Sequence, residues 1–141
     1  MGTWTLRRRF PANAEEVGPV RREVAAYARE HGIADPDAVA LAVSEALTNA
    51  VVHAYVDAPA PGDVEVVARR VEDNGLEVRV CDDGRGMAAR PDSPGLGLGL
   101  PLVAAVGERF EVQAKSDGGT RLLMVFAHAA QRPYAGDILD L

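Results

Sequence analysis

The sequence contains very little lysine. Lys115 is the only lysine among 15 lysine and arginine residues, and it follows Ala114 rather than a glycine-rich loop. A P-loop needs a lysine directly after its glycines, and a protein kinase of the eukaryotic type needs a strand lysine together with a His-Arg-Asp loop. Neither pattern occurs in the sequence, so any nucleotide chemistry requires other residues.

Cysteine and long apolar runs are also scarce. Cys81 is the only cysteine, which excludes an internal disulfide and fits a reducing compartment; we expect it in or beside a strand, without a chemical role. No run approaches the ~18 apolar residues of a membrane span, and no apolar region follows the basic residues near the N-terminus. We therefore expect a cytoplasmic protein that does not enter a membrane.

The sequence has no excess of positive charge. Its net charge is −6, whereas a surface that binds nucleic acid needs clustered lysine and arginine, so direct nucleic-acid binding is not expected. The run Arg7-Arg8-Arg9 either meets an acidic partner or forms the solvated face of a strand. Hydrophobic residues make up 48% of the 141 residues, which predicts one globular domain over residues 1–130 and an irregular tail over 131–141.

Periodicity and turn signals predict an α/β (α+β) two-layer sandwich. A mixed but mostly antiparallel sheet is expected, covered on one face by three helices. Asn13 and Glu16 resemble a capping box, and Asp35-Pro36 marks a second helix start. The expected strands cover residues 4–10, 64–71, 76–81, 110–114 and 120–127. The expected helices cover residues 14–31, 37–55 and 97–106.

A row of polar residues follows the predicted helix 37–55. Glu45, Asn49 and His53 recur at i, i+4 and i+8, apart from the apolar stripe of the same helix. The carboxamide oxygen of Asn49 suits Mg²⁺, and the carboxylate of Glu45 suits a base for a hydroxyl or water. On this helix alone, a solvated polar face is favoured over a ligand site as the explanation of the row.

Two glycine-containing segments follow predicted strands. Asp82 ends one strand and opens Asp-Asp-Gly-Arg-Gly, where a carboxylate can accept a hydrogen bond from an exocyclic amine and glycines let a flat ring approach. An ordinary turn is the alternative. Gly118-Gly119-Thr120 enters the last strand, where the Thr120 hydroxyl can support a neighbouring polar group; an ordinary β-turn is again the alternative.

The segment Gly95-Leu-Gly-Leu-Gly-Leu100 opens the predicted helix 97–106. Backbone N–H groups at a helix start bind phosphate, and glycines remove side chains that would block it. The segment differs from the Rossmann pattern because Leu100 occupies the place of the final glycine. A flexible hinge is the alternative.

Taken in this order, the motifs resemble the GHKL (Bergerat-fold) ATPase superfamily, which includes gyrase, MutL and the catalytic domains of histidine kinases. The resemblance spans residues 6–127. Residues 41–55 and 97–102 are further similar to the anti-sigma-factor serine kinases. Those are small single-domain members that phosphorylate a serine of an anti-anti-sigma (STAS) partner and so regulate transcription by partner switching.

The resemblance implies ATP and Mg²⁺ as cofactors and a role for each motif. Glu45 would be the general base, Asn49 the Mg²⁺ ligand, and Asp82 the acceptor for the adenine amine. For His53 a structural role beside the site is favoured over phosphate contact, and either Arg85 or Arg90 would meet the phosphates. The remaining residues expected to bind the nucleotide are Gly84, Gly86, Met87, Gly95, Gly97, Leu98, Gly99, Leu100 and Thr120.

Three functions remain open at this point. The first is an ATP-dependent protein-serine/threonine kinase that acts on a STAS partner. The second is a catalytically silent ATP-binding module that sequesters a sigma factor or another protein. The third, a detached histidine-kinase catalytic domain, is less favoured because no phosphoacceptor histidine or dimerisation helix pair is evident. The resemblance also implies a homodimer, which we expect to form through the edge strand 6–10 and the first helix.

Overall fold

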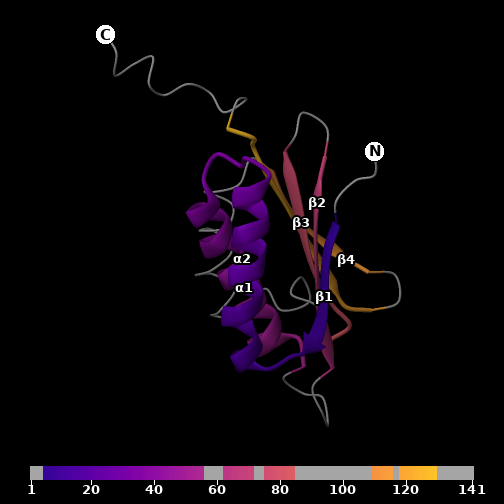
Figure 1. The fold of residues 1–141 in the computed structure, drawn as a ribbon. Helices are drawn as coiled ribbons and strands as arrows, with labels where there is room; N and C mark the ends of the chain where they lie inside the picture. Colours follow the sequence, from indigo (N-terminus) through magenta and orange to yellow (C-terminus); the bar gives the residue numbers. More distant parts are fainter. Residues whose placement is uncertain (1–4, 56–61, 72–74, 85–108, 116–117, 130–141) are drawn as a thin grey trace.

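Five strands of the described chain form one sheet, and two α-helices cover one of its faces (Figure 1). The computed structural model describes residues 5–55, 62–71, 75–84, 109–115 and 118–129. The strands are β1 (Thr5–Pro11), β2 (Asp63–Arg70), β3 (Leu76–Asp82), β4 (Arg109–Ala114) and β5 (Thr120–Phe126). The helices are η1 (Ala14–Glu16), α1 (Val17–Glu30) and α2 (Pro36–His53).

The strand order is β1-β2-β3-β5-β4, and every pair of described strands is antiparallel. The predicted α+β sandwich is confirmed. The sheet was expected to be mixed, but no parallel pair of strands occurs among the described strands. β1 lies at an edge, as predicted. β5 pairs with β3 and so separates β3 from β4, a neighbour relation that strand periodicity does not reveal. The predicted helix 97–106 lies outside the described residues.

Alternation along the strands divides the sheet into an apolar and a polar face. Val64, Val66 and Ala68 of β2 are buried, and the buried residues of β5 also recur at every second position. This face packs against α1 and α2. The opposite face carries charged side chains such as Arg69 and Arg79, which both pair with the nearly buried carboxylate of Glu77.

The start of α2 follows the sequence signals closely. Asp35 is the N-cap residue, and its Oδ1 accepts a hydrogen bond from the backbone N–H of Ala38 at 3.0 Å. Pro36 occupies the first helical position, where its missing N–H costs nothing. Val43, Ala46 and Leu47, which belong to the apolar stripe of this helix, are fully buried. The stripe therefore fixes which side of α2 faces the sheet.

The predicted helix 14–31 begins differently from expectation. A 3₁₀ turn, η1, precedes α1, and the predicted capping box at Asn13 and Glu16 does not form. Asn13 Oδ1 instead accepts from the N–H of Glu15 at 2.8 Å, while the N–H of Glu16 donates to the Asn13 carbonyl at 3.0 Å. That i+3 bond belongs to a 3₁₀ turn and removes the N–H that a capping box would use.

Candidate nucleotide site

The polar row on α2 contains a buried amide. Asn49 is only 6% exposed, and its Nδ2 is buried without a hydrogen-bond partner in the described part of the chain. Glu45, one turn earlier, is half-buried. A solvated helix face is therefore the wrong interpretation at Asn49. A buried donor that lacks a partner costs free energy, and an acceptor atom of a bound group would remove that cost. His53 ends α2, and its side chain lies outside the described residues.

The last residue of β3 is a buried carboxylate on the helix side of the sheet. Asp82 is 3% exposed, and its Oδ1 accepts a hydrogen bond from the N–H of Gly84 at 2.9 Å. Burial raises the pKa of Asp82, while the backbone N–H groups of Gly84 and Thr120 partly oppose that rise. A carboxylate can accept about four hydrogen bonds, so this one retains capacity for an amine donor.

Thr120 lies opposite Asp82 across the β3–β5 pair and is also buried. The preceding turn passes very close to β3. Gly119 has a φ of 93°, and a Cβ at this position would lie 2.1 Å from the carbonyl oxygen of Asp82. The Gly-Gly-Thr segment is therefore more than a common turn, because only glycine lets the start of β5 approach the end of β3 so closely.

The end of α2 is joined to the end of β3. A Cβ at Gly84 would lie 1.9 Å from the carbonyl oxygen of Ala54, so the turn after Asp82 packs directly on the helix terminus. Asn49 precedes Ala54 by five residues, which is about 7.5 Å along a helix axis. The fold thus brings the α2 row and Asp82 to the same end of the two-layer structure.

Tyr55 strengthens this junction, a role that the sequence does not predict. Its hydroxyl donates to the carbonyl oxygen of Asp63 at 2.6 Å and accepts from the N–H of Asp83 at 2.9 Å. Burial raises the pKa of Tyr55, so the hydroxyl stays protonated over the physiological range. A single tyrosine after a helix carries no distinctive spacing, so no sequence signal identifies this role.

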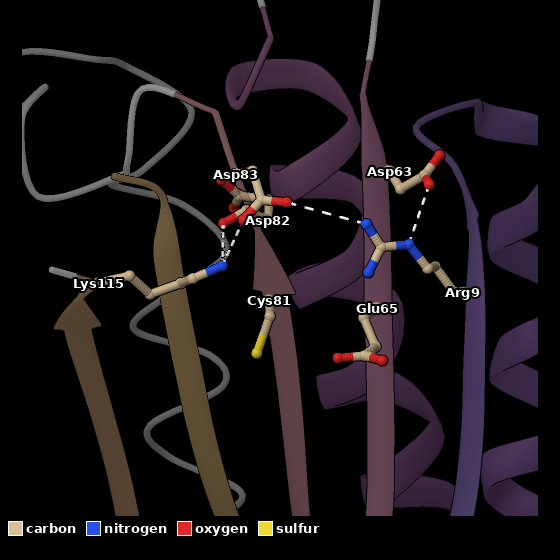
Figure 2. A pocket seen from close by; sticks show the side chains of 7 residues that line it. All are labelled: Arg9, Asp63, Glu65, Cys81, Asp82, Asp83 and Lys115. Carbon is tan, nitrogen blue, oxygen red and sulfur yellow. Dashed lines mark hydrogen bonds and ion pairs between the residues drawn. The ribbon is translucent and has the colours of Figure 1, made fainter. Parts of the chain in front are cut away.

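A second, polar pocket lies on the sheet face away from the helices (Figure 2). Its volume is about 80 Å³, and ion pairs hold it together. Lys115 pairs with Asp83 and lowers the pKa of that carboxyl, and Arg9 Nε lies 3.0 Å from Asp63 Oδ2. The neighbours Asp82 and Asp83 therefore have opposite environments: Asp82 is buried, and Asp83 is exposed beside a cation.

The arginine run of β1 is paired within the chain. Arg7 binds Glu65, Arg8 binds Glu23 and Arg9 binds Asp63, and all three arginines are substantially exposed. Because all three arginines already have carboxylate partners within the chain, a solvated strand face explains the run better than a binding surface for an acidic partner does. Cys81 lies on β3 beside the polar pocket and is half-buried, as expected for a residue of a strand.

Several predicted site residues belong to the segments that the structure does not describe. Those that lie outside the described residues are Arg85, Gly86, Met87, Arg90, Gly95, Gly97, Leu98, Gly99 and Leu100. Within the described ranges, no three His, Cys, Asp or Glu side chains are grouped to hold a metal ion. Mg²⁺ usually takes one or two protein ligands plus phosphate and water oxygens, so Asn49 still fits such an ion.

Comparison with known proteins identifies the family. Residues 10–126 match the family described as histidine kinase-like ATPase domain. The chain belongs to the histidine kinase-like ATPase domain family. The superfamily resemblance predicted from the motifs is thereby confirmed, and ATP use follows from membership.

Sequence relatives of this ATPase domain are named as an anti-sigma factor and as a serine-protein kinase. An anti-sigma F factor of Clostridium acetobutylicum is 30% identical over 129 residues, which cover 82% of this chain and 88% of the relative. A serine-protein kinase RsbW of Bacillus cereus is 32% identical over 133 residues, covering 82% and 80%. Both names agree with the narrower resemblance noted for residues 41–55 and 97–102.

The same fold occurs in a solved histidine kinase. The histidine kinase domain of the Erythrobacter litoralis EL346 blue-light activated histidine kinase superposes with a TM-score of 0.57 at 23% identity. The match covers 86% of this chain and 63% of that chain. Within the described part of this domain, no helix is long and apolar enough to cross a membrane.

Proposed function

We propose that this domain binds Mg-ATP and transfers the γ-phosphoryl group to a serine or threonine of an anti-anti-sigma (STAS) partner. The observation that carries the proposal is the buried amide of Asn49, whose Nδ2 has no hydrogen-bond partner among the described residues. It lies one turn from Glu45, on the helix whose end packs against Gly84, two residues after Asp82. The names of the sequence relatives support the choice of partner.

Each described residue has a distinct task in this proposal. The buried carboxylate of Asp82 accepts a hydrogen bond from the adenine amine, and Thr120 supports it from the neighbouring strand. Asn49 would hold Mg²⁺ through its oxygen, and the bound ion would neutralise phosphate charge. The glycine-rich segment 95–100, with Gly86 and Met87 before it, is proposed to enclose the phosphates and the base.

Glu45 is proposed to act on the acceptor. The serine oxygen forms a bond to the γ-phosphorus while the bond to the β–γ bridging oxygen breaks and ADP leaves, and the hydroxyl proton passes to the Glu45 carboxylate. Such a reaction depends mainly on positioning and charge stabilisation, so the junction between α2 and β3 matters as much as the base.

The test is phosphotransfer from γ-labelled ATP to individually purified STAS-domain proteins of the source organism. We expect acid-stable label on one of them, because phosphoserine survives acid and phosphohistidine does not. Glu45→Gln should abolish transfer while ATP affinity stays within twofold. The matched control is Glu30→Gln on the exposed end of α1, which should behave as wild type.

The alternative outcomes are distinct. Normal transfer by Glu45→Gln would remove the base assignment. A wild-type protein that binds ATP and a sigma factor without labelling any STAS protein would be the silent sequestering module, which the name anti-sigma F factor also fits. Label that is lost in acid would instead support histidine-kinase chemistry.

We also propose a homodimer formed through β1 and α1. The supporting observation is that β1 pairs with β2 alone among the described strands, which leaves its other edge available. Sedimentation equilibrium tests this point. A dimer that becomes monomeric when Leu6→Pro is introduced at that edge would support it, and a monomeric wild type would contradict it.

A further inference from the structure

The peptide group between Asp82 and Asp83 is held at both of its polar atoms. Its carbonyl oxygen, which belongs to Asp82, accepts a hydrogen bond from Lys115 Nζ at 3.4 Å. Its N–H, which belongs to Asp83, donates to the Tyr55 hydroxyl at 2.9 Å. Because a peptide group is planar, contacts at these two opposite atoms restrict its orientation. They therefore also restrict the direction in which the Asp82 side chain leaves the backbone.

Lys115 reaches this peptide group from two strands away. It directly follows β4, and β5 lies between β4 and β3 in the sheet. Its backbone donates to the carbonyl of Gly119 and accepts from the N–H of Gly118, both at 3.1 Å. A Cβ at Gly119 would lie 2.1 Å from the same Asp82 oxygen that the lysine contacts. The glycine therefore leaves room beside that oxygen for the ammonium group.

The ammonium group of Lys115 belongs to a line of alternating charges on the open face of the sheet. Figure 2 shows Lys115 beside Asp83, and Arg9 Nη2 lies 4.0 Å from Asp83 Oδ2. The side chain of Lys115 is 20% exposed, whereas that of Asp83 is 55% exposed. A lysine ammonium carries three donors, so the pair with Asp83 leaves donors for the Asp82 carbonyl. The ion pair thus keeps the lysine at the end of β3.

We propose that Lys115 is a positioning residue for base recognition: it holds the peptide group after Asp82, from the sheet face opposite the helices, so that the Asp82 carboxylate meets the adenine amine. The inference rests on the proposed function, in which Asp82 is the acceptor for that amine. Burial raises the pKa of Asp82, and the Lys115 charge opposes that rise. The lysine therefore also favours the ionised carboxylate, which is the stronger acceptor.

The test compares two nucleotides that differ only in the exocyclic amine. ATP and purine riboside triphosphate, which carries hydrogen in place of the amine, are each titrated into the protein. The ratio of their dissociation constants measures selectivity for the amine. Lys115→Met should lower this selectivity at least about fivefold, the scale of one lost hydrogen bond. Lys115→Arg keeps a cation on a long side chain and should stay within about twofold of the wild type.

Arg109→Met is the matched control. It removes a cation from the other end of β4, where Arg109 pairs with Glu111, and should leave the selectivity within about twofold. An unchanged selectivity in Lys115→Met would overturn the proposal. That includes the case in which both nucleotides bind more weakly by the same factor, as the loss of a direct phosphate contact would cause.

A double variant tests whether Lys115 and Tyr55 act on the same peptide group. Tyr55→Phe with Lys115→Met should lower the selectivity by less than the product of the two single effects, because either loss alone already frees the peptide. The full product would contradict a shared peptide group and overturn the proposal.

Only nucleotide binding is measured, so the outcome does not depend on labelling of a STAS protein. A wild type that binds ATP and the analogue equally would overturn the assignments of both Asp82 and Lys115. A wild type that prefers ATP, with the same preference in Lys115→Met, would overturn the Lys115 assignment alone.

Discussion

The hydroxyl of Tyr55 accepts a hydrogen bond from the backbone N–H of Asp83 at 2.9 Å. The same hydroxyl donates to the carbonyl of Asp63, so one side chain ties the end of α2 to both β2 and β3. Asp83 directly follows Asp82, whose carboxylate is proposed to accept a hydrogen bond from the adenine amine. The contact therefore connects the helix of Glu45 and Asn49 with the strand of Asp82.

Tyr55→Phe should weaken this connection. The substitution leaves the N–H of Asp83 and the carbonyl of Asp63 without their partner, so we expect a loss of about 1–3 kcal/mol in the free energy of unfolding. Urea denaturation measures it. ATP affinity, measured well below the unfolding transition, should fall at least threefold, and an unchanged affinity would mean that Tyr55 only stabilises the fold.

Two glycine-to-alanine substitutions should have opposite effects. Gly84→Ala places a Cβ where the carbonyl oxygen of Ala54 lies 1.9 Å away, so either β3 or α2 must move. We expect a loss of at least about 2 kcal/mol, as for other clashes in packed regions, together with loss of ATP binding. Thermal unfolding followed by circular dichroism and ATP titration provide the two measurements.

Gly18→Ala is the matched control. It lies in α1, and its nearest neighbour is the flexible end of Arg22 at 3.4 Å. Alanine is the better helix former, so the variant should gain about 0.5–1 kcal/mol. A stable, ATP-binding Gly84→Ala variant would show that the contact between the turn and the helix end is not required.

Asp82 should reduce stability as it ionises. Burial raises its pKa above the ordinary 3.8, so between these two values the folded chain binds more protons than the unfolded chain. The free energy of unfolding contributed by this group therefore falls as the pH rises through that window. Asp82→Asn should remove the fall, and it should be more stable than the wild type at neutral pH.

Unfolding in urea at a series of pH values from 4 to 7 tests the sign. The stability difference between Asp82→Asn and wild type should grow as the pH rises. A difference that shrinks with rising pH would mean that the folded state favours the ionised carboxylate.

The contribution of Asp83 to the free energy of unfolding should change with pH in the opposite direction. Lys115 lowers its pKa, so the ion pair contributes stability above the ordinary carboxyl pKa of 3.8, and this contribution is lost as the pH falls through the lower folded value. The Asp83 side chain is 55% exposed, so solvent and salt screen the pair. Lys115→Met should cost less than about 1 kcal/mol at neutral pH, and less still in 1 M salt. A larger cost that salt does not change would contradict a surface ion pair.

The sequence predicts local structure well where spacing and capping decide it. Asp35-Pro36 marks the start of α2, and the buried stripe through Val43 and Leu47 follows from helical periodicity. The 3₁₀ turn at Ala14–Glu16 was missed because Asn13 bonds to the N–H of Glu15, a choice between neighbouring donors that spacing does not distinguish.

The sequence predicts which residues form the site, but it does not predict how deeply they are buried or what surrounds them. Glu45, Asn49 and Asp82 were recognised from a combination of motifs, whereas the burial of Asn49 and the opposite surroundings of Asp82 and Asp83 depend on packing between α2, β3 and β5. The roles of Tyr55 and Lys115 depend on contacts across 28 and 32 positions of the chain. No local pattern encodes such contacts.

The nucleotide site is the central claim, and isothermal titration with ATP tests it most directly. The wild type and Asp82→Asn are each titrated with and without Mg²⁺, and Asn49→Ala is added as a third variant. We predict micromolar binding by the wild type that depends on Mg²⁺, is lost in Asp82→Asn and loses its Mg²⁺ dependence in Asn49→Ala. Absence of binding by the folded wild type, or equal binding by Asp82→Asn, would contradict the account.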